Sequence, residues 1–274
     1  MMAMTSHSSR QPLGPALSSR VPAPWRLSLV TETVSTNADL LARAAAGEAE
    51  GAVLVTEFQR GGRGRLDRSW SSPPGAGLTF SILVRPTAPK TAWGWLPLLA
   101  GLALRDAIGE GVLKWPNDLL VGADEGKAAG ILAEVAAGAA VIGVGLNVTT
   151  TRDELPVPTA TSLLLDGIEN GIENGIERLD RGSVLVDFLD RFGGYYRGWQ
   201  DTGGDAVASG LLERYRSACA TLGRSVSVEL VAGRLRGEAA GIDPEGRLLI
   251  RCADRVELSA VAAGDVSHLR SDTG

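Results

Sequence analysis

Residues 59–70 constrain the fold most, because they join the end of a buried strand to a concentration of positive charge. They follow the apolar run 51–56, which is rich in Val and Leu and is typical of a buried strand. Four arginines and three glycines lie between Gln59 and Trp70. Glycine lets backbone N–H groups approach a ligand, and arginine neutralises oxyanions with forked donors. Because α/β folds place ligand sites where strands end, we expect this loop to bind a strongly anionic ligand.

The chain as a whole is acidic, so the positive charge of residues 59–70 is a local feature. The chain has 274 residues, 44% of them hydrophobic and 22% charged, and a formal net charge of −5. This length can bury a core in one large domain or two. An acidic chain of this kind is not a general nucleic-acid binder, which normally has a basic face. A cationic loop on an acidic protein favours a small anionic ligand.

The cysteines and the apolar runs indicate the cellular compartment. Cys219 and Cys252, with His7 and His268, have no metal-ligand spacing and form no disulfide framework. We therefore expect a cytoplasmic protein. No run of about 18 apolar residues is present, so no membrane span is expected. Residues 1–24 lack the apolar core of a signal peptide and are predicted to be a disordered leader.

Two regions with different patterns of apolar residues follow the leader. Residues 25–222 alternate apolar, strand-like runs with helical patterns, including an almost wholly apolar helix over 95–108. From Gly223 the chain changes to short alternating strands with a strong turn at 243–246. These patterns predict a larger domain over 25–222 and a small β-barrel over 223–274. The near-repeat of one tetrapeptide over 167–177 is interpreted as a surface insertion.

Four separate stretches carry polar or glycine-rich signals, and each alone is compatible with ordinary structure. Ser35, Thr36 and Asn37 stand at a helix start, where one cap would be enough. Asn117 and Asp118 follow a proline that interrupts an apolar run, as in a plain turn. The other two stretches are Lys127 before an apolar strand and the run 143–147, Gly-Val-Gly-Leu-Asn.

The order and spacing of these stretches resemble the biotin protein ligases. Gly62-Arg63-Gly64-Arg65, followed by Arg68 and Trp70, matches one motif of that family, and 114–118 (Lys-Trp-Pro-Asn-Asp) and 127–132 (Lys-Ala-Ala-Gly-Ile-Leu) match two others. The resemblance covers roughly residues 29–269. It implies an α+β fold with a mixed-sheet catalytic domain, like the class II synthetases and lipoate ligases, and a small C-terminal SH3-like β-barrel.

The resemblance also implies a two-step reaction. Biotin's carboxylate attacks the α-phosphate of ATP, with Mg²⁺, and gives biotinyl-5′-AMP and pyrophosphate. A lysine of a biotin carboxyl carrier domain of an acyl-CoA carboxylase then displaces AMP. The implied partners include neither nucleic acid nor membrane, and the expected state is a monomer or weak homodimer. With about 24 residues before the first strand, a short form without the family's DNA-binding domain is expected.

The site residues implied by the resemblance fall into three groups. Catalysis is expected of Lys127, Arg65 and Asp118, with Asp118 placed to orient the incoming amine or the metal. The biotin-binding residues are expected to be Ser35, Thr36, Asn37, Gln59, Gly62, Arg63, Gly64, Arg65, Lys127 and Gly130. The ATP-binding residues are expected to be Arg65, Arg68, Trp70, Asn117, Lys127 and Asn147.

Asp67 departs from the family pattern, which commonly has glycine at this position. An aspartate here can pair with a neighbouring arginine and reduce the loop's net charge, so we expect weaker retention of the adenylate than glycine would give.

Three alternatives stay open from the sequence. A lipoate or octanoate ligase shares the catalytic fold, but lipoate has no ureido group for Ser35 and Gln59 to bind. An Arg-Gly nucleic-acid-binding segment would usually recur many times, whereas this one occurs once. A catalytically silent biotin-binding regulator would keep the same pocket.

Overall fold

The main domain is built on a seven-stranded mixed sheet. The computed structural model describes residues 10–66, 68–168, 172–173, 176–177, 180–230, 233–253, 256–262 and 264–269, so Asp67 and much of the tetrapeptide repeat lie outside the described residues. The strand order is β1-β2-β5-β9-β8-β7-β6. Only β1 and β2 pair in parallel, and each other neighbouring pair in this sheet is antiparallel. The strands are β1 (Arg26–Thr33), β2 (Ala52–Gln59), β5 (Gly77–Val84), β6 (Val112–Lys114), β7 (Asp118–Val121), β8 (Gly126–Ala136) and β9 (Ala139–Asn147).

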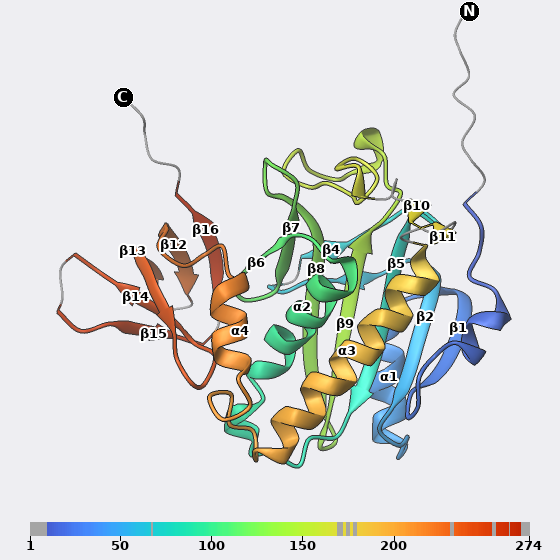
Figure 1. The fold of residues 1–274 in the computed structure, drawn as a ribbon, viewed down its shortest axis with the longest axis horizontal. Helices are drawn as coiled ribbons and strands as arrows, with labels where there is room; N and C mark the ends of the chain where they lie inside the picture. Colours follow the sequence, from blue (N-terminus) through green and yellow to red (C-terminus); the bar gives the residue numbers. More distant parts are fainter. Residues whose placement is uncertain are drawn as a thin grey trace, which may run out of the picture.

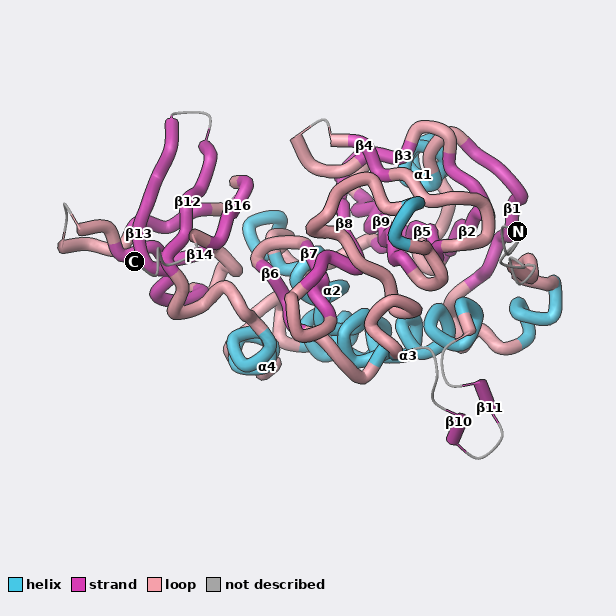
Figure 2. Tube along the Cα trace, turned by 90° about the horizontal axis from the view of Figure 1, so that it is seen from above, coloured by secondary structure: helices cyan, strands magenta, loops and turns pink. Residues whose placement is uncertain are grey.

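Helices cover the two faces of this sheet unequally. Helix α1 (Thr36–Ala45) lies on one face, and α2 (Trp95–Ile108) and α3 (Arg181–Asp201) lie side by side on the other (Figures 1 and 2). Helix α2 is apolar almost all round because it is buried between the sheet and α3, and its predicted bounds are confirmed. The α1 face keeps a longer uncovered stretch of sheet, and the functional site lies there.

The Arg/Gly loop crosses this less covered face as a small hairpin. Strands β3 (Gly62–Arg63) and β4 (Ser69–Trp70) pair with each other and belong to no larger sheet. Figure 2 shows the hairpin on the α1 side, above β8, β9 and β5. The loop therefore folds over the strands, and its side chains can reach the sheet beneath.

A second, smaller sheet follows helix α4 (Leu211–Ala218). It is antiparallel with the order β15-β14-β13-β12-β16, and its strands are β12 (Ser225–Leu230), β13 (Gly233–Ile242), β14 (Leu248–Arg251), β15 (Ser259–Val261) and β16 (Asp265–His268). The pairings between described residues form an open sheet. The antiparallel C-terminal unit is therefore as expected, and its closure into a barrel stays a prediction.

The remaining elements are short. They are the 3₁₀ helices η1 (Pro15–Ser19), η2 (Lys90–Ala92) and η3 (Arg152–Glu154), and the strand pair β10 (Ile172–Glu173) and β11 (Ile176–Glu177). None of the helices that the structure describes is long and apolar enough to span a bilayer.

Residues 10–24, predicted to be part of a disordered leader, are ordered, and the prediction is wrong for them. Arg10 pairs with Glu154 at 2.6 Å and donates to the carbonyl of Thr149 at 3.1 Å. The Leu13 N–H donates to Glu57 at 2.6 Å, and Leu17 is buried. Tertiary contacts of this kind are not visible in the composition of the segment.

We expect Glu154→Gln to destabilise the protein in a pH-dependent way. The hydrogen bond from Arg10 holds the pKa of Glu154 at about 2, below its ordinary 4.5. A depressed carboxyl pKa contributes stability that is present above about pH 4.5 and is lost as the pH falls toward 2. Urea unfolding should show a loss of about 1–2 kcal/mol at pH 7 that shrinks at pH 3.

Glu32→Gln is the matched control for this measurement. Glu32 pairs with Arg60, but their side chains are 44% and 63% exposed. An exposed pair of this kind contributes little, so the loss should stay under about 0.5 kcal/mol. A Glu154→Gln loss that is equally small, or that does not change with pH, would contradict a role for residues 10–24 in the fold.

Candidate functional site

A cavity of about 120 Å³ lies between the β3–β4 hairpin and the sheet, and it gathers most of the predicted site residues. Every predicted site residue lines it except Gly62 and Asn147. Its walls are Ser35, Thr36, Asn37, Gln59, Arg63, Gly64, Arg65, Leu66, Arg68, Ser69, Trp70, Thr79, Phe80, Asn117, Asp118, Lys127, Gly130, Ile131, Leu132, Gly143, Val144, Gly145, Gly264 and Asp265. Segments from both domains, far apart in the sequence, thus meet around one space.

Neutral hydrogen-bonding side chains occupy the end of the cavity nearest α1. Ser35 is the N-cap of α1, and its hydroxyl accepts from the Ala38 N–H. The side-chain carbonyl of Gln59 accepts from the Thr36 N–H at 2.9 Å and lies 3.2 Å from its hydroxyl. Only one of the three polar residues at this helix start serves as the cap, and all three line the cavity.

Asn37 links this end of the cavity to β8. Its amide nitrogen donates to Glu134 at 2.8 Å, and its side-chain oxygen lies 2.6 Å from the hydroxyl of Ser81. Arg63 pairs with the same Glu134 at 3.1 Å. The loop is therefore attached to the sheet on the side of α1.

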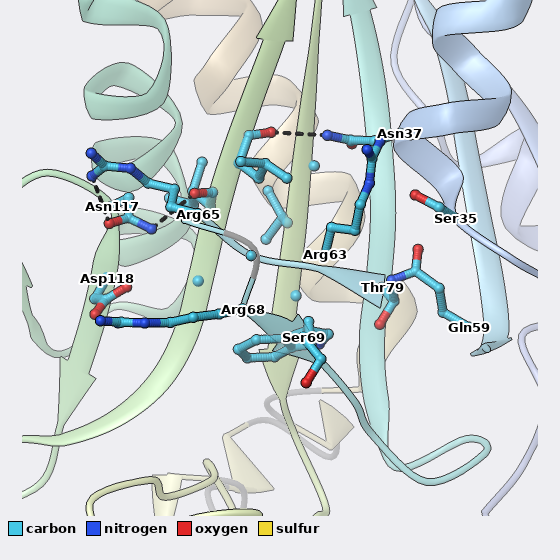
Figure 3. Close-up of a pocket in the computed structure, with 18 of the residues that line it drawn as sticks. Ser35, Asn37, Gln59, Arg63, Arg65, Arg68, Ser69, Thr79, Asn117 and Asp118 are labelled. Carbon is cyan, nitrogen blue, oxygen red and sulfur yellow. Dashed lines mark hydrogen bonds between the residues drawn. The ribbon is translucent and has the colours of Figure 1, made fainter. Parts of the chain in front are cut away.

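Cationic side chains gather at the opposite end. Arg65 donates to the side-chain oxygen of Asn117 at 3.2 Å, and Lys127 lies 2.7 Å from Asp118. Arg68 forms an ion pair with Asp265, on β16 of the C-terminal sheet. Figure 3 shows that Arg63 leaves the loop toward Asn37, Arg65 toward Asn117, and Arg68 toward Asp118.

The electrostatics of this end favour an anion. Burial lowers the pKa of Arg65, and the neighbouring Arg68 lowers it further, while Asp118 and Asp265 act in the opposite direction. Positive groups brought this close repel one another unless negative charge lies between them. The site is suited to stabilising an added polyanion.

The Trp70 ring packs against the strands where two glycines face each other. Gly130 and Gly145 are paired across β8 and β9. A Cβ at position 145 would lie 2.3 Å from Cε2 of Trp70, so only glycine leaves room for the ring. The indole nitrogen of Trp70 is buried and has no hydrogen-bond partner in the part of the chain that the structure describes.

The two predicted residues outside the cavity have structural partners. Asn147 is buried and donates to the Thr161 carbonyl at 3.0 Å. Gly62 pairs with Trp70, and a Cβ there would lie 2.3 Å from the Trp70 carbonyl oxygen. Both residues hold neighbouring parts of the site in place.

Sequence reasoning did not identify several residues that the fold brings to the site. Thr79, on β5, lines the cavity, and Glu134, on β8, contacts Asn37 and Arg63 at its edge. The alternation of side chains along a strand is the signal that could have assigned them to this face of the sheet. Asp265 comes from the C-terminal sheet, and no local signal separates it from an ordinary surface aspartate.

A second cavity, of about 740 Å³, adjoins the first at Arg65 and Asn117. It is bounded by α2, β8 and the C-terminal sheet, and its walls include Trp93, Leu96, Pro97, Ala133, Val135, Gly246 and Ala262. This cavity gives an open approach to the cationic end of the site.

Comparison with known proteins adds to this geometry. A family model described as the biotin/lipoate A/B protein ligase family matches residues 30–149, and one described as the biotin protein ligase C-terminal domain matches residues 221–269. A biotin–[acetyl-CoA-carboxylase] ligase of Mycobacterium tuberculosis is 42% identical over 258 residues, 90% of each chain. A bifunctional ligase/repressor of Bacillus spizizenii is 32% identical over 76% of this chain and 64% of its own length. Among solved structures, the biotin protein ligase from Aquifex aeolicus in complex with biotin and ATP superposes with a TM-score of 0.72 at 28% identity, over 89% of this chain and 99% of that one.

We expect Gly145→Ala to loosen the Arg/Gly loop. The added methyl group would displace the Trp70 ring, and the loop would lose its contact with the sheet. Loosened loops are cut faster by proteases. Trypsin should cleave between residues 60 and 68 at least about threefold faster than in the wild type. Gly198→Ala, where a Cβ meets no atom within 4 Å, is the control, and equal rates in the two variants would contradict this role of Trp70.

Proposed function

The chain belongs to the biotin protein ligase family, and we propose that it activates biotin as biotinyl-5′-AMP and transfers the biotinyl group to a lysine of a biotin carboxyl carrier domain. The observation that carries the proposal is that one cavity has the hydrogen-bonding side chains Ser35, Thr36 and Gln59 near α1, and Arg65, Arg68 and Lys127 on the side of Asn117 and Asp118. A neutral ring with a carboxylate tail would fit the first end, and a triphosphate the second.

The neutral end supports binding of biotin's ureido group. That group has two N–H donors and one carbonyl acceptor, and it needs complementary atoms in an otherwise dry site. Ser35, Thr36 and Gln59 supply hydroxyls and an amide within one side of the cavity. Lipoate has no such group, so burying these side chains against its ring would leave them without partners.

The cationic end supports the chemical step. An oxygen of biotin's carboxylate attacks the α-phosphorus of ATP, an acyl–phosphate bond forms, and the bond to the pyrophosphate oxygen breaks. Two anions repel each other on approach, and positioned cations offset this repulsion. Lys127 and Arg65 line the same cavity and are held by the adjacent residues Asp118 and Asn117, so we assign them the carboxylate and the α-phosphate. Arg68 and Trp70 are assigned to the nucleotide.

Asp118 has a separate part in the proposal. Its ion pair with Lys127 holds the ammonium in place before substrates bind. In the second step the lysine ε-amine attacks the acyl carbon, AMP leaves, and a proton is lost from nitrogen. Asp118 is the carboxylate beside this point, and we assign it to orienting that amine.

Magnesium fits the site chiefly through the nucleotide. No group of three or more His, Cys, Asp or Glu side chains within the described ranges could hold a metal ion. Mg²⁺ prefers oxygen ligands and is commonly held by one or two carboxylates together with phosphates. Asp118 is the candidate protein ligand, and the ion would neutralise phosphate charge.

The second cavity is the proposed route for the carrier lysine. It reaches the site beside Asn117, and the next residue in the sequence is Asp118, which we assign to orienting the amine. The hairpin covers the other side and would shield the acyl-adenylate from water. A C-terminal sheet of SH3 type, a monomeric or weakly dimeric state and a cytoplasmic location complete the proposal.

Pyrophosphate release with ATP and Mg²⁺ tests the proposal, with biotin compared against lipoate. We expect release with biotin and a rate at least about 100-fold lower with lipoate, because its ring leaves buried polar groups unpaired. Equal rates, or a preference for lipoate, would overturn the assignment to biotin.

Lys127→Ala tests the chemistry of the cationic end. Loss of one positioned cation should lower the rate of biotin-dependent pyrophosphate release by at least about 100-fold. Lys90→Ala, in η2 outside the site, is the control and should leave the rate unchanged. Unchanged adenylation by Lys127→Ala would reject its role, and biotin binding without adenylation by the wild type would indicate a silent regulator.

A further inference from the structure

The tip of the β6–β7 hairpin touches the C-terminal domain on one side and the site on the other. Trp115 is the first residue of this tip and is 1% exposed. Its indole N–H donates to the Gly246 carbonyl at 3.0 Å. Its backbone N–H donates to the hydroxyl of Thr221 at 3.0 Å. Both hydrogen bonds are buried, and both acceptors lie beyond helix α4 in the sequence, in or next to the C-terminal sheet.

The same tip presents the site residues on its other side. Asn117 holds β8 through two hydrogen bonds, because its carbonyl accepts from the Ile131 N–H at 2.9 Å and its side chain donates to the Ile131 carbonyl at 3.1 Å. Its side-chain oxygen accepts from Arg65. Asp118, the next residue, holds Lys127. Movement of the tip would therefore move the acceptors of two cations of the site.

Thr221, the acceptor of the Trp115 backbone N–H, is itself held by a network of contacts. Thr221 is completely buried, and its hydroxyl also lies 3.1 Å from Nε2 of His268. Burial first, then the positive charges of Lys114 and Arg224, lowers the pKa of His268 to about 4, while Glu125 opposes them. His268 is therefore neutral at pH 7. Arg224 itself is held by a two-pronged pair with Glu125, at the turn between β7 and β8.

We propose that Trp115 is a positioning residue through which the C-terminal domain sets the location of Asn117 and Asp118. The inference rests on the proposed function for its catalytic consequence, and on the hydrogen bonds alone for its structural one. Trp115 lines the second cavity and not the first, and it lies next to Asn117 and Asp118 in the hairpin tip, so we assign its effect on the first cavity to the tip. In this account the C-terminal sheet is needed for the adenylation geometry as well as for covering the site.

Trp115→Phe tests the proposal, because it removes the donor to Gly246 and keeps an aromatic ring. Trp95→Phe is the matched control: Trp95 donates to Pro244 of the same turn, at 2.6 Å, but lies on α2 and carries no site residue. Trp25→Phe is a second control, which removes a 3.0 Å bond to the Leu189 carbonyl far from the site. Each of the three variants loses one hydrogen bond donated by the indole of a buried tryptophan.

The first measurement is biotin-dependent exchange of pyrophosphate into ATP. A displaced catalytic group slows chemistry more than it weakens binding, so Trp115→Phe should lower kcat at least about 10-fold with KM for biotin within about twofold. Both control variants should keep kcat within about twofold. A kcat for Trp115→Phe that matches the value for Trp95→Phe would overturn the proposal.

The second measurement is amide hydrogen exchange, which needs no activity. The Ile131 N–H should exchange faster in Trp115→Phe than in Trp95→Phe, because its acceptor is the Asn117 carbonyl. If the wild type shows no biotin-dependent exchange of pyrophosphate into ATP, the proposed function fails. The amide hydrogen exchange of Ile131 then tests the positioning role alone. Equal protection of this N–H in Trp115→Phe and Trp95→Phe would overturn that role.

Thr221 provides a variant pair should Trp115→Phe fail to fold. Thr221→Val removes the acceptor for the Trp115 backbone N–H and keeps the shape of the side chain, whereas Thr221→Ser keeps a hydroxyl. Thr221→Val should lower kcat at least about 10-fold, and Thr221→Ser should restore it to within about threefold of the wild type. Equal kcat values for the two variants would contradict the proposal.

Discussion

The repulsion between cations held close together is the constraint on which the rest of this structure depends. Arg65, Arg68 and Lys127 line one cavity, and each is held by a different acceptor. Burial lowers the pKa of Arg65 and makes its charge more costly to hold there. The acceptors come from the β6–β7 hairpin and the C-terminal sheet. The arrangement therefore requires both domains to be folded and docked.

This constraint explains why the site lies on the face that carries α1. The other face is closed by α2 and α3, and its side chains are apolar. On the α1 face, paired glycines in β8 and β9 let Trp70 lie against the strands, so the hairpin can approach the sheet closely. A cavity of about 120 Å³ remains between them. The neutral side chains at the start of α1 lie at the end of this cavity that is opposite Arg65, Arg68 and Lys127.

The sequence predicted the parts of the fold and site that depend on local pattern. The bounds of α2 followed from its nearly uniform apolar character, and the loop at 59–70 followed from its charge and glycines. Asp265 and the order of residues 10–24 could not be predicted in this way. Asp265 reaches Arg68 only because the C-terminal sheet docks beside the β3–β4 hairpin. Arg10 pairs with Glu154, which is 144 residues away in the sequence. Contacts of this kind depend on tertiary packing and leave no periodic signal.

In the proposed function, one chemical event takes place at one point of the cavity: a carboxylate and an α-phosphate meet beside Lys127. The most direct test is the product held by the wild-type protein after incubation with biotin, ATP and Mg²⁺ and without a carrier protein. We predict about one molecule of bound biotinyl-5′-AMP for each chain, with one pyrophosphate released, as in a single turnover that stops at the acyl-adenylate. Formation of ADP and phosphate, or retention of unreacted biotin and ATP, would contradict the account.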